Sequence, residues 1–401
     1  MDEPTPGAPV AFSWPCWRGA KRDGVVEFLP ERLPSKDAIR WSKRLSYNAL
    51  AGVAANEEVV IVADRDPADT MDVFRCLDAK TGEEKWARRY LARGELDYGN
   101  SSRSTPVIHG ELAFVASAHG HLHALDLATG EVRWKQDFRR DYAVEGELPW
   151  GFCSSPLVDQ GRLIVNPGGK FAALAALDPA TGKAIWKAAG ENLPGHGSMI
   201  VATLGGVRQI VGHDKVSLGG WDAASGKRLW TVVPPLKGDF NVPTPMVWRD
   251  KLVVATENNG TRMYAFGKGG QIVAEPVATS ADLVPDSHSP VVLGDRLFGV
   301  SDGLYALDLA NGLSTIWKSD DAAFGEYAAL IAGSGRVLAI TLRGELILFD
   351  AAADKFTPLA RVKLLDDEAG LYSHPAVVGR TMFVRGSARI VRYDLDAAAK
   401  K

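Results

Sequence analysis

The 401-residue sequence has few cysteines, almost no excess charge and no long apolar run, and each shortage excludes a class of protein. Its three cysteines, Cys16, Cys76 and Cys153, form no Cys-x-x-Cys pair, so neither a disulfide framework nor the common zinc, redox and haem motifs are expected. The 46 lysines and arginines against 49 aspartates and glutamates leave a net charge of -3, unlike the basic footprint of a nucleic-acid binder. No apolar run approaches the roughly 18 residues that predict a transmembrane helix.

Signals for common enzymes and for export are also lacking. The sequence contains no P-loop, Gly-x-Ser-x-Gly or His-Glu-x-x-His pattern. Residues 1–7 are acidic and proline-rich, without the basic start and apolar segment of a secretory signal. Two interpretations stay open: a cytosolic protein, or a mature exported chain that received a start methionine after its signal was removed. With 46% hydrophobic and 24% charged residues, the chain can bury a large core.

Tryptophan is abundant, and its spacing reveals a repeat. A frame of the form Asp-x-x-(Thr/Ser)-Gly-x-x-x-Trp ends at Trp86, Trp134, Trp186 and Trp230, and a copy one residue longer ends at Trp317. The successive intervals are 48, 52, 44 and 87 residues. Because the last interval is nearly twice the one before it, we expect a further copy without tryptophan, in which Ala274 takes the indole's place.

A second block, often containing Ser-Pro or Thr-Pro, precedes each frame. Its copies begin near Tyr47, Ser104, Ser154, Ser198, Thr244, Ser289, Tyr327 and Ser373. Between the blocks lie short apolar runs separated by Gly, Asn and Asp, as strands and hairpins require. The aspartate and glycine of each frame indicate a turn, because aspartate accepts backbone hydrogen bonds and glycine adopts positive φ. The pattern predicts eight all-β units and few helices.

Four short strands in about 40–45 residues, repeated, are the signature of a β-propeller blade. We therefore predict an all-β protein, a single eight-bladed β-propeller of four-stranded blades, with indoles packed between neighbouring blades. The last unit ends before its tryptophan, and residues 38–45, which contain Trp41, offer the missing strand. The expected organisation is an N-terminal extension (1–37), the propeller (38–395, closed by 38–45) and a disordered tail (396–401).

The frame reads Ala-x-Asp-x-x-Thr-Gly-x-x-x-Trp at residues 124–134 and 176–186, where it resembles the tryptophan-docking motif of quinoprotein alcohol dehydrogenase-like propellers. This superfamily of PQQ-like repeats includes pyrroloquinoline quinone (PQQ) dehydrogenases and the propeller lipoprotein of the outer-membrane β-barrel assembly machinery. Residues 14–24, Trp-Pro-Cys-Trp-Arg-Gly-Ala-Lys-Arg-Asp-Gly, resemble the start of secreted PQQ-like repeat proteins. The resemblance implies a periplasmic or secreted chain.

The resemblance also raises the question of a cofactor. Many dehydrogenases of this superfamily stack the quinone on a disulfide ring between adjacent cysteines, whereas Cys153 stands alone beside Phe152. Their calcium ligands and catalytic aspartate match no positions here, and their long insertions and haem domain are missing. No cofactor is therefore expected, with PQQ and calcium as the alternative, and we favour a binding protein over an enzyme.

Propellers usually bind ligands at one mouth of the central channel, where the loops entering the innermost strands converge. Aligning the second blocks brings a mixture of amides, charged groups and a phenol to this mouth, with Cys153 and His374 close by. The candidate ligand-binding residues are Asn48, Arg103, His196, Asn241, Asp286, His288, Glu326 and Tyr372. Such a set suits an anionic or sugar-like ligand. The alternative is a hydrated polar channel whose groups satisfy one another and ordered water.

Histidines raise a further alternative, a metal site. His196, His288 and His374 stand at different positions relative to their blocks, and odd shifts along a strand turn side chains to opposite faces. His119, His121 and His123 alternate, but they fall at a hairpin where other units place an exposed turn. Because zinc demands strict ligand geometry, we expect no metal at either place.

We therefore expect a non-catalytic scaffold in the cell envelope or outside the cell. Its partner is a protein or peptide, bound on a propeller face or an exposed strand edge, or a small polar ligand. Nucleic acid is not an expected partner, and we expect a monomer. The alternative function is a small PQQ-dependent or sugar/alcohol oxidoreductase with its site at the channel mouth.

Overall fold

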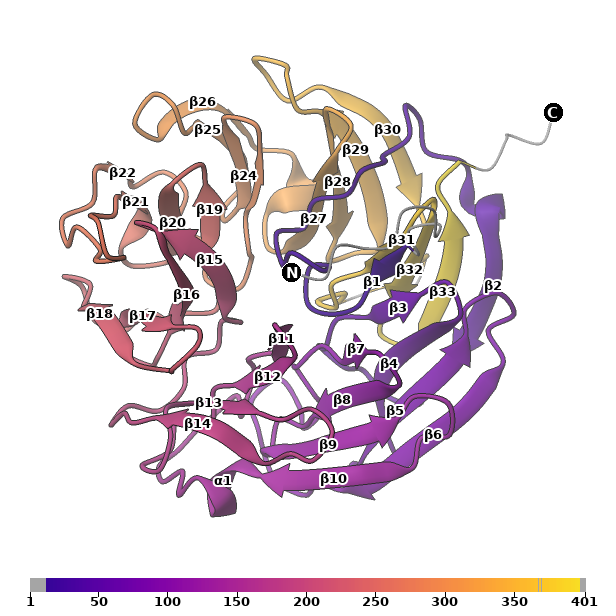
Figure 1. Ribbon diagram of the computed structural model, residues 1–401. Helices are drawn as coiled ribbons and strands as arrows, with labels where there is room; N and C mark the ends of the chain where they lie inside the picture. The colour runs from indigo at the N-terminus through magenta and orange to yellow at the C-terminus, as the bar shows by residue number, and fades with distance from the viewer. Residues whose placement is uncertain (1–11, 367, 369, 397–401) are drawn as a thin grey trace, which may run out of the picture.

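Eight antiparallel sheets follow one another around a central axis in the computed structural model, which describes residues 12–366, 368 and 370–396 (Figure 1). Helices are minor: α1 (Phe138–Asp141) and the 3-10 turns η1 (Lys36–Ala38) and η2 (Ala322–Phe324). The predicted all-β, eight-bladed propeller is confirmed. Across the described ranges, none of the helices is long and apolar enough to cross a membrane.

The first four blades run in chain order, each from its innermost to its outermost strand. The first blade comprises β3 (Ala54–Asn56), β4 (Val59–Arg65), β5 (Met71–Asp78) and β6 (Glu84–Leu91), and the second comprises β7 (Val107–His109), β8 (Leu112–Ala116), β9 (His121–Asp126) and β10 (Val132–Asp137). The third blade comprises β11 (Leu157–Asp159), β12 (Arg162–Val165), β13 (Leu174–Leu177) and β14 (Ala184–Ala188), and the fourth comprises β15 (Ile200–Leu204), β16 (Val207–His213), β17 (Leu218–Asp222) and β18 (Arg228–Val232). A short strand, β1 (Ser13–Trp14), pairs with the inner edge of β3.

The last four blades follow the same order. The fifth blade comprises β19 (Met246–Trp248), β20 (Lys251–Thr256), β21 (Gly260–Tyr264) and β22 (Ala278–Ser280), and the sixth comprises β23 (Val291–Leu293), β24 (Arg296–Val300), β25 (Leu304–Asp308) and β26 (Ser314–Ser319). The seventh blade comprises β27 (Ala328–Gly333), β28 (Arg336–Thr341), β29 (Glu345–Asp350) and β30 (Pro358–Lys363), and the eighth comprises β31 (Ala376–Val378), β32 (Thr381–Arg385), β33 (Arg389–Asp394) and β2 (Ile39–Arg44).

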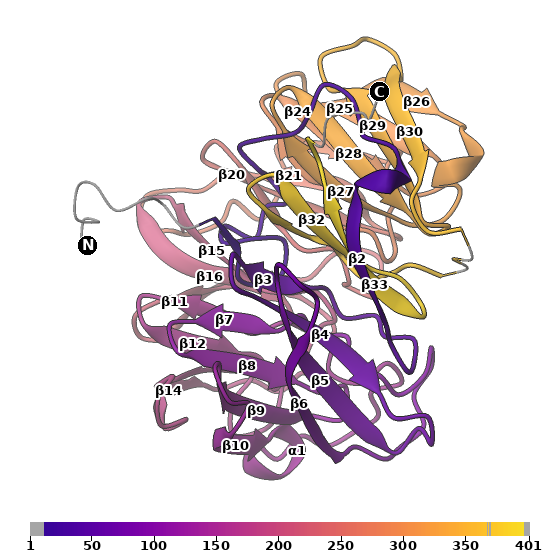
Figure 2. The same ribbon diagram turned by 90° about the vertical axis from the view of Figure 1, so that its right-hand side faces the viewer.

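The N-terminal strand β2 closes the ring. It lies antiparallel beside β33, with Ile39 opposite Tyr393 and Arg44 opposite Arg389, so the indigo strand β2 and the yellow strand β33 are neighbours (Figures 1 and 2). One apolar cluster spans the seventh, eighth and first blades and includes Leu29 of the N-terminal segment. Closure by residues 38–45 is thus confirmed in pairing and in packing.

Tryptophans of the outer strands dock several of the blades onto a turn of the next blade. At the closure, a Cβ added to Gly82 would lie 2.7 Å from the ring of Trp41, so this turn requires glycine for space as well as for its φ of 74°. The Trp41 indole N–H donates to the carbonyl of Ala79 at 3.1 Å. The same contact joins Trp86 to Gly130 in the next blade. Because the indole covers a turn of the neighbouring blade, it fixes the angle between the two sheets.

Hydroxyl groups of the Ser-Pro blocks link the blades at their inner ends. The Thr105 hydroxyl accepts from the Gly52 amide at 3.1 Å, and the Thr105 amide donates to the Ser155 hydroxyl at 2.9 Å. The Ser155 amide in turn donates to the Ser198 hydroxyl at 3.0 Å. The block's serine or threonine therefore satisfies a buried amide of the preceding blade.

The fifth blade departs from the sequence alignment. Its outer strand does not contain Ala274 but begins at Ala278, after a turn in which Phe266 pairs with Ile272. Pro276 has no amide hydrogen to donate, so ladder pairing resumes only beyond it. The copy without tryptophan exists, but assigning Ala274 to the indole's place was wrong.

The proposed domain boundaries meet the described residues only in part. Residues 14–24 of the predicted extension lie inside the ring, as described below, and Asp396 follows the last strand with its carboxylate 2.7 Å from Arg380. The remainder of the predicted disordered tail, residues 397–401, lies outside the described residues, as do residues 1–11. The boundaries stay a proposal.

Candidate functional site at the channel mouth

The N-terminal segment that resembles secreted PQQ-like proteins lies inside the ring of blades. The Arg18 side chain is fully buried and donates to the carbonyl of Pro290 at 2.6 Å. Arg22, only 5% exposed, donates to the carbonyls of Ser155 and Pro156 at 3.0 and 2.8 Å. Because these carbonyls belong to the sixth and third blades, residues 14–24 cross the channel and tie distant blades together; we call them the plug. Burial lowers the pKa of Arg18 to about 10, so it stays charged at neutral pH.

The plug leaves a pocket of about 700 Å³ at the channel mouth, which we call the cup. Its wall consists of loops entering the innermost strands and of hairpins joining the second and third strands of the fifth and sixth blades. Trp17 is the plug's contribution to the lining, and its indole N–H donates to the Thr244 hydroxyl at 2.9 Å. Sites that hold small ligands have volumes of about 300–1,000 Å³.

Five of the eight candidate ligand-binding residues line the cup, together with Cys153. They are Arg103, His196, Asp286, Glu326 and Tyr372. They come from different blades, and the loop alignment brought them together before the structure did. Ligand binding by them stays a prediction.

The other three candidates do not line the cup. The exposed Asn48 accepts a hydrogen bond from Arg385 at 3.2 Å. Asn241 is buried, and its amide nitrogen donates to the carbonyls of Asp214 and Lys215 at 3.2 and 3.3 Å. His288 is buried, with Nδ1 2.6 Å from the carbonyl of Ala328. Aligning the second blocks identifies the loops that reach the mouth, but it does not predict which side chains of those loops point into the cup, because that depends on local backbone angles.

The alignment of the second blocks missed the second set of loops and Phe240 of the aromatic wall, whereas the sequence had suggested that Trp150 either covers the mouth or packs under its own loop. Glu257 follows β20 and Asp302 follows β24, so both stand just beyond the second strand of a blade. Trp150 packs edge-on against His196 and Phe240, with ring centroids 5.1 and 4.9 Å apart. Aligning the ends of the second strands would have identified the two carboxylates, but no local signal points to Phe240.

Arg103, His196 and Cys153 favour neither anion binding nor nucleophilic chemistry. The Arg103 guanidinium donates to the carbonyls of Asp97, Gly99 and Ser101 at 2.5–2.7 Å, and burial lowers its pKa. Burial lowers the pKa of His196 to about 4, so it is neutral at pH 7. Burial raises the pKa of Cys153 to about 11, which leaves a neutral thiol and a poor nucleophile.

The cup is therefore acidic. Asp302 is paired with Lys318 at 3.1 Å, but Glu257, Asp286 and Glu326 form no ion pair within the part of the chain that the structure describes. Burial raises the pKa of Glu257, and the nearby charges of Asp239 and Asp286 raise it further. Burial also raises the pKa of Tyr372, and Glu326 and Asp286 add to this shift. The charge of Asp286 therefore contributes to raising the pKa values of both Glu257 and Tyr372.

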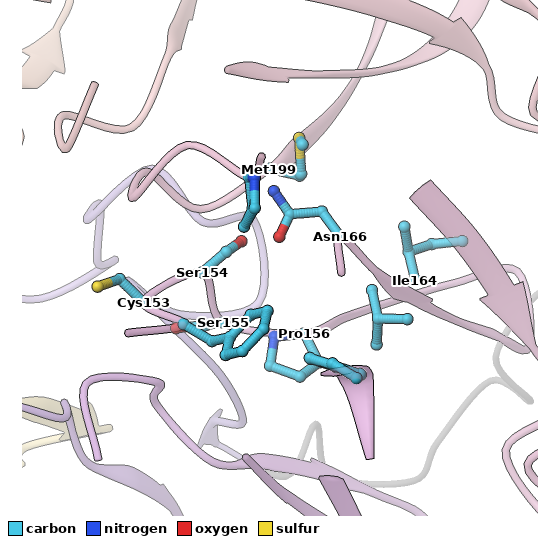
Figure 3. Close-up of a pocket in the computed structure, with 11 residues that line it drawn as sticks. Cys153, Ser154, Ser155, Pro156, Ile164, Asn166 and Met199 are labelled. Atoms are coloured by element: carbon cyan, nitrogen blue, oxygen red, sulfur yellow. The ribbon is translucent and has the colours of Figure 1, made fainter. Parts of the chain in front are cut away.

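A second, much smaller cavity lies behind the wall of the cup. It has a volume of about 10 Å³ and is lined by Cys153, Ser154, Ser155, Pro156, Ile164, Asn166 and Met199, among others (Figure 3). That space suits about one water molecule. It is therefore a packing gap between blades and not a ligand site.

The histidines are dispersed. Across residues 12–366, 368 and 370–396, no three His, Cys, Asp or Glu residues are arranged to hold a metal ion. The expected exposed turn at His119–His123 was wrong in part, because His121 and His123 belong to β9 and His123 is 6% exposed. Both imidazoles pack on the ring of Tyr90, at centroid distances of 5.8 and 4.2 Å.

Eight four-stranded blades, indoles docked on glycine turns and a cup at the channel mouth define an eight-bladed propeller of the PQQ-like repeat class. Residues 34–147 and 95–319 match the family described as outer membrane protein assembly factor BamB. The match covers more than half of the chain, which therefore belongs to this family.

Among curated relatives, outer membrane protein assembly factor BamB of Shewanella oneidensis is 23% identical over 340 residues, covering 71% of this chain and 82% of that protein. Quinohemoprotein alcohol dehydrogenase ADH-IIG of Pseudomonas putida is 27% identical over 158 residues, which are 37% of this chain and 21% of that enzyme. The second relative thus shares only part of its length.

Solved structures agree on the fold. BamB from Moraxella catarrhalis superposes with a TM-score of 0.60 at 16% identity, over 90% of this chain and 99% of that one. Quinohemoprotein alcohol dehydrogenase ADHIIG from Pseudomonas putida gives 0.66 at 12% identity, over 97% and 81%. Likenesses at such low identity show the propeller alone.

The residues of the cup do not fit PQQ. This cofactor carries three carboxylates, whereas the cup presents Glu257, Asp286, Asp302 and Glu326. Its one lining arginine already bonds to three carbonyl oxygens. These like charges repel unless a cation lies between them, and across the described residues no three His, Cys, Asp or Glu are arranged to hold one. Cys153 also has no neighbouring cysteine with which to form a disulfide ring.

Proposed function

We propose that this protein is a non-catalytic scaffold of the cell envelope, periplasmic or secreted, that binds a protein partner at the cup. It acts as a monomer and requires no cofactor. Membership of a family described as an outer membrane protein assembly factor supports a partner among proteins that insert or assemble in that membrane.

The observation that carries the proposal is the plugged channel mouth with an exposed aromatic rim. Tyr98 is 72% and Phe240 44% exposed, and both line the cup. Large aromatic side chains that stay exposed around a hollow are typical of protein contact surfaces. In the lining, the pKa of the Cys153 thiol is raised to about 11 and that of His196 is lowered to about 4, so neither supplies a thiolate or an imidazolium at pH 7.

Site-directed photo-crosslinking tests this proposal in the native host. A photoreactive amino acid replaces Tyr98 at the rim or, as a matched control, Ile185, which is 50% exposed on the outer strand of the third blade. We expect a cross-linked envelope protein from Tyr98, identified as an outer-membrane assembly component by mass spectrometry, and none from Ile185. Adducts from Ile185 alone, or an absence of adducts at both positions, would contradict the proposal.

Titration with PQQ, with and without calcium, tests the oxidoreductase alternative. A ligand that binds the folded state at 100 times its dissociation constant adds about 2.7 kcal/mol of stability. We expect no shift in melting temperature and no change in tryptophan fluorescence. Saturable calcium-dependent binding, followed by dye reduction with alcohols or sugars, would favour the enzyme instead.

A further inference from the structure

We propose that the cup recognises its partner by receiving a lysine or arginine side chain from a loop or chain end. This inference rests on the proposed function and names the chemistry of the partner. A pocket of about 700 Å³ holds a few residues of peptide rather than a whole domain. The partner's side chain, not its fold, is therefore the element recognised there.

Charge complementarity is the first argument. Glu257, Asp286 and Glu326 come from three separate loops and meet in one cup without an ion pair in the described residues. One Glu257 oxygen, Oε1, accepts from the Phe240 amide, while the other, Oε2, is shielded from solvent and has no hydrogen-bond partner. A carboxylate oxygen left in this state favours a charged donor, because charge-assisted hydrogen bonds are the strong ones in proteins. Asp286 and Glu326 are exposed at the mouth and add negative charge beside it.

Among the described residues, Arg103 is the one lysine or arginine of the lining, so the four carboxylates outnumber the cations there. Arg103 is turned onto three backbone carbonyls, and His196 is neutral at pH 7. Lys318 is held at the edge by Asp302 and by Asp320, at 3.1 Å each. The net negative charge of the cup is therefore available to a ligand.

The aromatic wall is the second argument. Trp150, Phe240 and His196 form one contiguous group of rings, and Tyr327 and Tyr372 form another, with centroids 5.2 Å apart. Flat rings attract lysine and arginine through cation–π contacts and accommodate their aliphatic stems. An anionic or purely apolar group would use the rings but would meet the carboxylates unpaired.

The test uses the full chain and two fluorescent pentapeptides, Gly-Arg-Gly-Arg-Gly and the same peptide with citrulline, a neutral isostere, in place of arginine. We expect saturable binding of the arginine peptide, weakened by salt, and at least about tenfold weaker binding of the citrulline peptide. Equal binding of the two peptides, or no binding of either, would overturn the proposal.

Two double variants with the same change in charge separate the cup from the rest of the surface. D286N with E326Q removes two of the three carboxylates of the cup that form no ion pair, and leaves Glu257 in place. D250N with E111Q changes exposed residues in the hairpins that join the first and second strands of the fifth and second blades. We expect the first pair to weaken binding about tenfold or more and the second to leave it within about twofold. Circular dichroism and melting temperature establish that both variants are folded. Equal losses in both pairs would refute the assignment of the cup.

Crosslinking from Tyr98 in the D286N/E326Q variant distinguishes this inference from the proposed function. If the adduct persists although the arginine peptide does not bind, the result supports the proposed scaffold function and contradicts recognition of a basic side chain. If the wild-type protein gives no adduct from Tyr98 but binds the arginine peptide, the cup captures basic groups and the proposed scaffold function falls.

Discussion

Deletion of residues 1–45 tests how the ring is held together. The deletion removes β2, which faces β33 through five residue pairs, from Ile39–Tyr393 to Arg44–Arg389. At about 1 kcal/mol for each backbone hydrogen bond, this pairing contributes on the order of 5 kcal/mol. Loss of the docked Trp41 adds about 3 kcal/mol, because truncating a packed tryptophan leaves a cavity. The sum of about 8 kcal/mol is comparable with the whole stability of a typical domain, about 5–15 kcal/mol.

A nested pair of truncations separates the strand from the plug. A chain starting at Ser35 lacks Arg18 and Arg22 but keeps β2, whereas a chain starting at Ser46 lacks both. We expect the shorter deletion to lower the urea midpoint and the longer one to abolish the cooperative transition, followed by circular dichroism and tryptophan fluorescence. A chain starting at Ser46 that melts at the wild-type temperature would refute closure by the N-terminal strand.

Three further predictions concern stability. Gly82→Ala should lower the free energy of unfolding, measured in urea, by about 1–3 kcal/mol more than Gly294→Ala does. Both glycines have positive φ, but a Cβ at Gly82 would lie 2.7 Å from an indole, whereas a Cβ at Gly294 meets nothing within 4 Å. Equal losses in the two variants would contradict the docking geometry. Ser155→Ala should cost about 1–3 kcal/mol, because the buried Thr105 amide loses its acceptor, and an unchanged midpoint would show that this relay is dispensable. Burial lowers the pKa of His288 to about 3, below its unfolded value of about 6.5, so unfolding takes up a proton at any pH between these two values. The free energy of unfolding therefore falls by about 1.4 kcal/mol per pH unit as the pH drops through that window. His288→Gln should reduce this slope by one proton, and an unchanged slope would show that His288 titrates normally.

Much of the fold could be predicted because the determinants of a blade are local. The aspartate and glycine of the frame make a turn whose hydrogen bonds lie within a few residues. In the second blade these are Asp126 and Gly130, and the Asp126 carboxylate accepts from the Thr129 amide at 2.9 Å. The missing last strand was equally predictable, since an open ring leaves an unpaired edge. The fifth blade was predicted, but the position of its outer strand was wrong because this strand begins at Ala278, beyond Pro276, which no spacing of tryptophans records.

The candidate site was predicted only in outline. Arg103 and Asp286 were found because the loops entering the innermost strands converge by symmetry. The role of Arg103 was not predictable, because its guanidinium is satisfied by carbonyls of its own loop. Asn241 was misplaced because its φ of 55° turns the residue into the left-handed region, where strand alternation no longer applies.

The sequence by itself determined the number of blades, the docking of the tryptophans and the strand that closes the ring, because each depends on a short motif and its spacing. Only the tertiary structure decided that residues 14–24 plug the channel, since Arg18 and Arg22 bond to carbonyls more than 100 residues away. The acidic character of the cup was likewise a tertiary outcome. It depends on which of many charged side chains from separate blades remain unpaired once the ring has closed.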